Sequence, residues 1–303
     1  MKLSAFTAAF FSLILILSMF VFSFLFGFFK IDNMLISIFS EEIFVFGIPT
    51  FLFFYITKAN PKDVFSLHPI GAANIIIIFL ISITMQPILM SVSAFSSIFF
   101  ENDASKFLQS MASFPALPAL LMAALMPAFF EEMYFRGIIF SNYRHVEIKK
   151  ACLMTGLFFG LAHMNPQQFL YAFIMGTVFC YFVYRTGSIF SSMLSHFTIN
   201  GTQTILSAYM TRNFSQGAVS QAAAESLHFS DFIPFFVLSI ISLIPVILLF
   251  IAFERINKPK YSDIVSEKAL DFNCTYYEQE KVLYWPLIVI LIIYALYILK
   301  IYI

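Results

Sequence analysis

Long apolar runs, repeated along the chain, are the feature that most restricts how this sequence can fold. A helix needs about 20 apolar residues to cross about 30 Å of hydrocarbon, and in lipid only helices and closed barrels satisfy their backbone hydrogen bonds. Nine runs of this kind occur, at residues 5–29, 40–57, 71–99, 113–141, 150–165, 167–184, 187–211, 231–253 and 282–302. The sequence therefore predicts an all-α, polytopic transmembrane helix bundle of about nine spans.

The composition supports a membrane protein and argues against a nucleic-acid-binding one. Of the 303 residues, 60% are hydrophobic and only 11% are charged, and the mean hydropathy is +0.88. Soluble globular domains are far less apolar. The formal net charge is zero and no basic cluster is present, so we expect membrane lipid as a partner and no nucleic acid.

The Lys and Arg residues divide unevenly when the nine runs are placed alternately across a membrane. One side takes most of them: Lys2, Lys58, Lys62, Arg144, Lys149, Lys150, Arg185, Arg255, Lys258, Lys260, Lys268 and Lys281. The other side takes only Lys30, Lys106, Arg212 and Lys300. Because cytoplasmic loops hold the excess of these residues, we expect the N-terminus in the cytoplasm, the C-terminus outside and residues 254–281 as a cytoplasmic loop.

The fourth apolar run contains charged residues in its middle, namely Glu131, Glu132 and Arg136. Each costs about 2.5 to 3.5 kcal/mol at the bilayer centre when it is ionised and unpaired. Glu132 and Arg136 are four residues apart and can form an intrahelical ion pair. Glu131 is rotated by about 100° from Glu132, so it faces a different partner or a cavity. Pro127 removes the helical hydrogen bond to the carbonyl of Ala123, and the resulting kink opens space beside the glutamates.

Three further polar residues lie in other apolar runs: His163, and the pair His196 and Asn200 on one helical face. We counted the depth of Glu131, His163 and His196 from the nearest predicted cytoplasmic charge. All three lie about 16 to 20 Å into the membrane at the helical rise per residue. Asn200 lies one turn further, so we expect these groups from three helices to meet at one level around a polar intramembrane cavity.

This set of side chains is suited to the hydrolysis of a peptide bond. In a low-dielectric cavity the carboxyl group of Glu131 can accept a proton from water near neutral pH. His163 can hold the same water, while His196 and Asn200 can donate hydrogen bonds to the oxyanion of a tetrahedral intermediate. A zinc site formed by Glu131, His163 and His196 remains an alternative, although no HExxH motif is present.

Three short motifs occur in this region in a fixed order: EEMYFR (131–136), FGLAH (159–163) and HFTIN (196–200). They match the patterns EExxxR, FxxxH and HxxxN, and on them the chain resembles the CAAX protease and bacteriocin-processing (CPBP, Abi) family of intramembrane endopeptidases. The resemblance covers roughly residues 113–205. We therefore divide the chain into N-terminal transmembrane helices (1–112), a catalytic core (113–211) and C-terminal helices with the cytoplasmic loop (212–303).

The resemblance implies a helix bundle around a cavity that opens toward the cytoplasm, where eukaryotic relatives trim prenylated CAAX proteins. It implies that Glu131 and His163 activate the water, that His196 and Asn200 form the oxyanion site, and that Glu132 and Arg136 support the site. It favours a glutamate mechanism without a metal cofactor. Bacterial members are linked to bacteriocin maturation, self-immunity and signalling, and we expect this chain in a bacterial plasma membrane.

The leading functional hypothesis is an intramembrane glutamate-type endopeptidase that cleaves a hydrophobic or lipidated peptide. Two hypotheses from other classes remain. In a proton-coupled transporter, Glu131, Glu132 and Arg136 would form a proton relay. In a non-catalytic membrane scaffold or bacteriocin immunity protein, the same residues would stabilise the bundle without cleaving a substrate.

Overall fold

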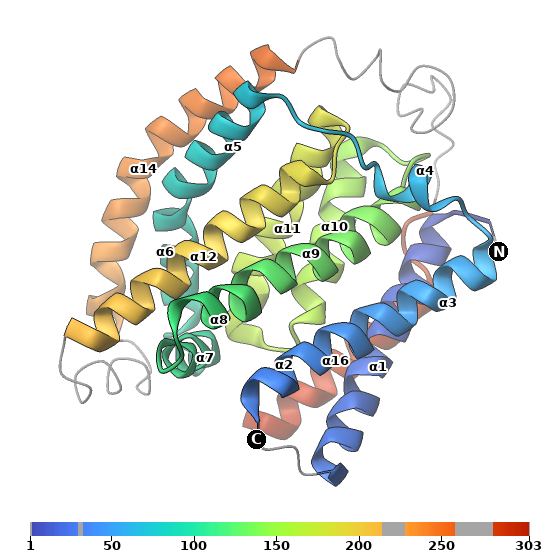
Figure 1. The fold of residues 1–303 in the computed structure, drawn as a ribbon, viewed down its shortest axis with the longest axis horizontal. Coiled ribbons are helices and arrows are strands. Elements are labelled where there is room, and N and C mark those ends of the chain that lie inside the picture. Colours follow the sequence, from blue (N-terminus) through green and yellow to red (C-terminus); the bar gives the residue numbers. More distant parts are fainter. Residues whose placement is uncertain (1, 30–32, 214–227, 258–280, 303) are drawn as a thin grey trace.

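The computed structural model describes residues 2–29, 33–213, 228–257 and 281–302, and Figure 1 shows their arrangement. These residues form helices and connecting turns, and no strand occurs among them. The expected all-α class is therefore confirmed. Of the predicted cytoplasmic loop 254–281, residues 258–280 lie outside the described residues.

The first half of the chain forms α1 (Ala5–Phe29), α2 (Met34–Glu42), η1 (Ile43–Gly47), α3 (Ile48–Thr57), α4 (Pro61–Phe65), α5 (Ala72–Thr84), α6 (Gln86–Ser96) and α7 (Asp103–Ala112). The second half forms α8 (Ala116–Leu120), η2 (Leu121–Leu125), α9 (Met126–Glu132), η3 (Met133–Ile139), α10 (Ile148–Ala162), α11 (Pro166–Thr186), α12 (Phe190–Asn213), α14 (Phe229–Ile256) and α16 (Trp285–Tyr302). The three segments named η are π-helical.

Three long helical rods lie side by side and run along one diagonal of Figure 1. They are α2–η1–α3, α8–η2–α9–η3 and α12. Both composite rods change their winding next to a pair of adjacent glutamates: η1 follows Glu41 and Glu42, and η3 follows Glu131 and Glu132. Because π-helical turns rotate the following side chains relative to an ideal helix, they are frequent at functional sites.

Helices α10 and α11 pack closely against each other, and glycines permit this approach. A β-carbon added to Gly176 would lie 2.8 Å from the Cα of Gly156, and one added to Gly156 would lie 2.8 Å from the carbonyl oxygen of Phe173. Small residues of this kind let transmembrane helices approach closely. A β-carbon added to Gly160, near the end of α10, would lie 2.9 Å from the carbonyl oxygen of Phe169 near the start of α11, so the helices also lie close together next to His163.

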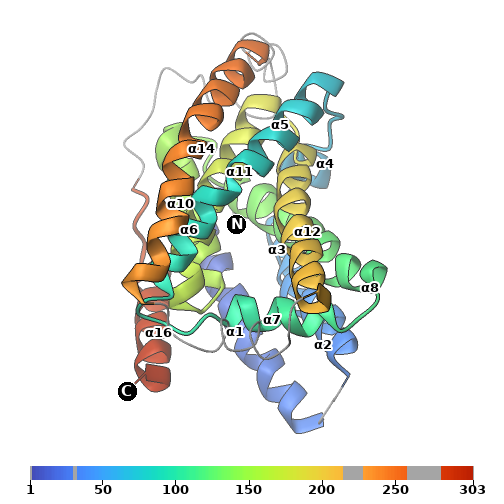
Figure 2. The ribbon, with the colours of Figure 1, turned by 90° about the vertical axis from the view of Figure 1, so that its left-hand side faces the viewer.

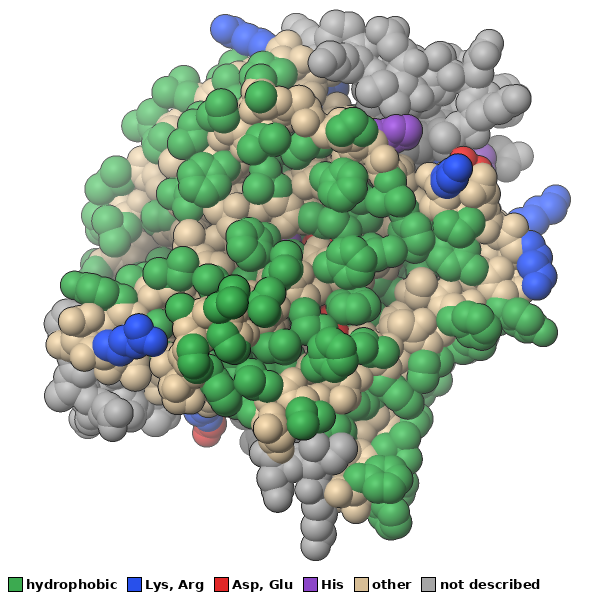
Figure 3. Space-filling model, in the orientation of Figure 1, with side chains coloured by type: hydrophobic (Ala, Val, Ile, Leu, Met, Phe, Trp, Pro, Cys, Tyr) green, Lys and Arg blue, Asp and Glu red, His purple; other side chains and the backbone are tan. Residues whose placement is uncertain are grey.

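The remaining helices surround this centre. Figure 2 shows α14 against α5 and α6, and it shows α7 crossing the lower end of the bundle. Helix α16 packs against α1, so the two ends of the chain contribute to one face. Figure 3 shows apolar side chains over the middle of the visible face, with Lys and Arg side chains at its margins.

Within the described residues, six helical segments are long and apolar enough to cross a membrane: Ala5–Phe29, Met34–Thr57, Ala72–Ser96, Ala116–Ile139, Pro166–Thr186 and Phe229–Ile256. Helices α10 and α16 are shorter, and α12 has many Ser and Thr residues, so these three do not meet the same criterion. Several apolar helices are consistent with an integral membrane protein. The expected count of about nine spans is not confirmed.

Candidate active site

A cavity of about 450 Å³ lies between the three long rods and the pair α10 and α11. Its lining includes Glu131 from α9, His163 at the end of α10, and His196 and Asn200 from α12. The structure thus brings together the four side chains to which the sequence assigned direct roles in catalysis. Apolar groups such as Phe135 complete the wall around them.

Glu132 and Arg136 form a buried ion pair beside this cavity. The Arg136 Nη1 atom donates to Glu132 Oε1 at 2.8 Å, and Nη2 donates to the carbonyl oxygen of Gly176 at 3.1 Å. Both side chains of the pair are fully buried. The guanidinium also lies 4.5 Å from the ring centre of Phe159 and 5.1 Å from that of Phe179, distances at which the ring faces attract a cation. This pair ties the glutamate helix to α11.

His196 is fixed in orientation by the same glutamate. Its Nδ1 atom lies 2.8 Å from Glu132 Oε1, so the Nδ1–H group donates to the carboxylate. The Nε2 atom is left for the cavity that the ring lines. A neutral ring would accept a hydrogen bond there, whereas a doubly protonated ring would donate one, and the adjacent carboxylate stabilises that positive charge.

His163 follows the last turn of α10 and is held by its own helix. Its Nδ1 atom lies 2.8 Å from the carbonyl oxygen of Phe159, so Nδ1–H donates and Nε2 is a hydrogen-bond acceptor. The next residue, Met164, has a positive φ of 47°, which turns the chain into α11. The ring is therefore presented to the cavity at a sharp helix–helix turn.

Asn200 replaces a hydrogen bond that Pro127 removes from the glutamate helix. Proline has no N–H group, so it cannot donate to the carbonyl of Ala123 four residues earlier. The Asn200 Nδ2 atom donates to that carbonyl oxygen at 3.3 Å. Neighbouring helices commonly satisfy backbone groups that proline frees in a membrane. One N–H bond of the amide and its oxygen remain for the cavity.

Glu131 differs from its neighbour because no other described residue forms a hydrogen bond or ion pair with it. The side chain is half-buried and lines the cavity. As the rotation about the helix axis predicts, the two carboxyl groups face different surroundings. Glu132 is bound by Arg136 and His196, whereas Glu131 faces the cavity. A carboxylate in this position can accept a proton from a bound water.

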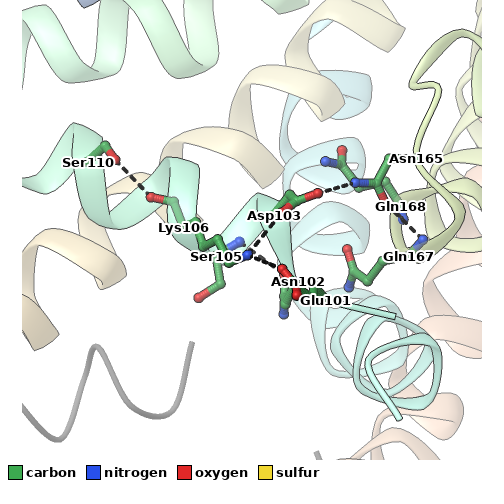
Figure 4. Close-up of polar contacts among 9 residues, drawn as sticks. All are labelled: Glu101, Asn102, Asp103, Ser105, Lys106, Ser110, Asn165, Gln167 and Gln168. Carbon is green, nitrogen blue, oxygen red and sulfur yellow. Dashed lines mark hydrogen bonds and ion pairs between the residues drawn. The ribbon is translucent and has the colours of Figure 1, made fainter. Parts of the chain in front are cut away.

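The cavity opens between α2 and α7, since the exposed members of its lining are Glu41 on α2 and Asp103 and Phe107 on α7. Figure 4 shows how α7 is fastened there: Asn165 Nδ2 donates to Asp103 Oδ2 at 2.8 Å. Lys106 forms ion pairs with Asp103 at 3.3 Å and with Glu101 at 2.5 Å. Helix α7 therefore forms one rim of the opening.

This opening lies at the end of the bundle that the distribution of Lys and Arg assigns to the outside. The lining residues of α11 come from its first half, which follows Asn165, the residue that donates to Asp103 of α7. Lys106 is also at this end, and the distribution of Lys and Arg assigns it to the outside. An opening toward the cytoplasm and an N-terminus in the cytoplasm therefore cannot both hold for this chain.

Two glutamates of the lining, Glu41 and Glu42, were not among the residues that we predicted from the sequence. They stand at the start of the second apolar run, where charges are ordinarily assigned to the membrane interface. The signal that could have found them is the doublet itself, because it repeats the Glu131–Glu132 doublet at the edge of another long helix.

The residues do not fit the zinc alternative as a preformed site. Among the described residues, no group of three or more His, Cys, Asp or Glu side chains is arranged to hold a metal ion. We derive no catalytic step through a metal.

Comparison with protein families gives one match, to the model described as type II CAAX prenyl endopeptidase Rce1-like, over residues 113–202. This segment of the chain is similar to the CAAX protease family. The match contains all three motifs, so the family resemblance drawn from them is confirmed. Searches of curated proteins and of solved structures give no match to the chain.

Proposed function

We propose that this protein is an intramembrane endopeptidase that hydrolyses a peptide bond of a hydrophobic or lipidated peptide. The CAAX protease domain implies a peptidase acting on membrane-associated peptides. The observation that supports a glutamate mechanism is the difference between two adjacent carboxylates. Glu132 is bound to Arg136 and His196, whereas Glu131 faces the cavity without a protein partner.

In the proposed reaction a water lies between Glu131 and His163. Glu131 takes one proton of the water as general base, and His163 Nε2 accepts a hydrogen bond from the other. The oxygen then attacks the carbonyl carbon of the peptide. When the tetrahedral intermediate collapses, the C–N bond breaks and protonated Glu131 returns its proton to the leaving nitrogen.

The oxyanion of the intermediate would accept hydrogen bonds from His196 Nε2–H and from the second amide N–H bond of Asn200. This role requires a doubly protonated His196 ring, because its Nδ1–H already donates to Glu132. The ion pair with Arg136 keeps Glu132 in place as the acceptor. Glu132 and Arg136 are thus positioning residues in this scheme.

The central test is cleavage by Glu131→Gln in membranes. We expect turnover to fall by about 10² to 10⁴-fold, since general-base catalysis contributes that much, while the protein stays folded. Glu147→Gln is the matched control, because Glu147 is exposed at the start of α10 and does not line the cavity. Turnover unchanged in Glu131→Gln would reject the mechanism. A scaffold or immunity protein would instead keep its full biological effect in this variant.

We also propose that the reaction needs no metal cofactor. Cleavage should then be the same before and after exhaustive chelation, and elemental analysis of the purified protein should find no stoichiometric metal. Loss of activity on chelation, with recovery on adding Zn²⁺, would support the zinc alternative instead.

For orientation, we propose that the cavity opens outside the cytoplasm. Ser110 is exposed on α7, and Glu147 is exposed at the other end of the bundle. In intact cells a membrane-impermeant maleimide should label Ser110→Cys, whereas Glu147→Cys should react only after permeabilisation. The reverse pattern would place the opening in the cytoplasm and would contradict the orientation derived from Lys and Arg.

A further inference from the structure

The carboxyl group of Glu42 is buried without a partner for one of its oxygens. Its side chain is 8% exposed, and Oε2 has no hydrogen-bond donor in the part of the chain that the structure describes. The side chain lines the same cavity as Glu131. Buried carboxyl groups are normally hydrogen-bonded or paired with a cation, so this arrangement indicates a position that a ligand completes.

Apart from its two histidines, the ionisable side chains that line the described part of the cavity are acidic. Its described lining contains four acidic residues, Glu41, Glu42, Asp103 and Glu131, and neither Lys nor Arg. Asp103 is paired with Lys106, and the buried Arg136 is occupied by Glu132 and the carbonyl of Gly176. The other three acidic residues of the lining have no basic partner among the described residues.

These three carboxyl groups belong to one region of the cavity. The carboxylate of Glu42 interacts electrostatically with that of Glu131 from the facing helix, and α2 packs against α9. Glu41 is exposed at the opening, one residue before Glu42. A chain entering between α2 and α7 would therefore meet Glu41 first and Glu42 next, before it reached the proposed base.

We propose that Glu42, assisted by Glu41 at the opening, forms a binding subsite for a positively charged group of the peptide substrate. This inference rests on the proposed function, and it names the substrate class as a peptide with an ammonium or guanidinium group near the cleaved bond. Such a group would supply the counter-charge that Glu42 lacks.

The test uses the full-length protein in liposomes and a set of apolar peptides that differ at one position. That position holds Lys, Arg, acetyl-lysine, Gln or Glu, and each peptide is made with a free and with an acetylated N-terminus. Mass spectrometry identifies the cleaved bonds and gives kcat/KM. We expect Lys and Arg peptides to be cleaved about tenfold faster than the acetyl-lysine peptide, which corresponds to one desolvated ion pair.

The same peptides are then tested with Glu42→Gln, and Glu147→Gln serves as the control with the same loss of charge at the other end of the bundle. We expect the preference for Lys over acetyl-lysine to disappear in Glu42→Gln and to persist in the control. A preference that follows the free N-terminus would assign the subsite to an α-amino group. Equal cleavage of Lys and acetyl-lysine peptides by the wild type, or a preference unchanged in Glu42→Gln, would overturn the inference.

Binding of the peptides, measured without turnover, separates this inference from the proposed function. Tighter binding of the Lys peptide to the wild type than to Glu42→Gln, with no cleavage that Glu131→Gln abolishes, would reject the peptidase and retain the subsite. Cleavage that depends on Glu131 but shows no dependence on peptide charge would do the reverse. Thermal unfolding of Glu42→Gln in detergent verifies that the variant is folded.

Discussion

Two helices of this protein each bring a pair of adjacent glutamates to one cavity, but their surroundings differ. On α9, Glu132 is held by Arg136 and His196, and only Glu131 is left to the cavity. On α2, neither Glu41 nor Glu42 has a basic partner among the described residues, although Glu42 is buried. From this difference we infer that a buried carboxyl group stabilises this bundle only where a basic side chain of the protein is paired with it.

The largest effect on stability should come from Glu132→Gln. This change leaves the buried charge of Arg136 without its counter-ion, and we expect a loss of about 3 to 5 kcal/mol in the free energy of unfolding. Denaturant unfolding in detergent micelles measures it. Glu131→Gln, the same substitution one residue earlier, should lose less than about 1 kcal/mol because no protein partner is removed. Equal losses of stability in the two variants would contradict the conclusion that Glu132 stabilises the fold and Glu131 does not.

A smaller loss is expected for Arg136→Lys, which keeps the charge but not the shape of the side chain. Lysine cannot reproduce both the bond to Glu132 and the bond to the Gly176 carbonyl with a planar group between Phe159 and Phe179. We expect a loss of about 1 to 3 kcal/mol in the same unfolding measurement. A stability equal to that of the wild type would show that the charge alone holds Glu132.

The smallest effect, and one of opposite sign, is expected for Glu42→Met on the other helix. Methionine removes a buried carboxyl group that has an unpartnered oxygen, so the free energy of unfolding should stay the same or rise by about 1 kcal/mol. The measurement is made on the ligand-free protein, with Glu147→Gln as an exposed control. A loss above about 2 kcal/mol would mean that Glu42 supports the fold in the way that Glu132 does.

Much of the α9 site could be predicted from local sequence, whereas the α2 pair could not. The spacing of Glu132 and Arg136 predicts an intrahelical pair, and the turn between Glu131 and Glu132 predicts that they face different ways. The depth of His163 and His196 from predicted cytoplasmic charges placed them at the same level. Glu41 and Glu42 stand at the start of an apolar run, and there the sequence does not distinguish an interfacial charge from one that faces a cavity.

The apolar runs by themselves determined that the chain is helical, because runs of about 20 residues fit a membrane-spanning helix, whereas a strand of a membrane barrel needs only about 10. The order of the motifs determined the family of the segment that contains them. The number of membrane spans could not be determined from hydropathy. The Ser, Thr and His residues of α12 lower its mean hydropathy, and only contacts with other helices offset the cost of burying these polar side chains.

Only the tertiary structure decided which groups of other helices contact Glu132 and Arg136. Sequence spacing fixes side-chain angles around one helix axis, but it does not fix which face of a second helix lies opposite. His196 and the Gly176 carbonyl come from segments 64 and 40 residues away from the groups that they contact, Glu132 and Arg136. Close packing through Gly156 and Gly176, together with the π-helical turns after each glutamate pair, sets the positions that the sequence left open.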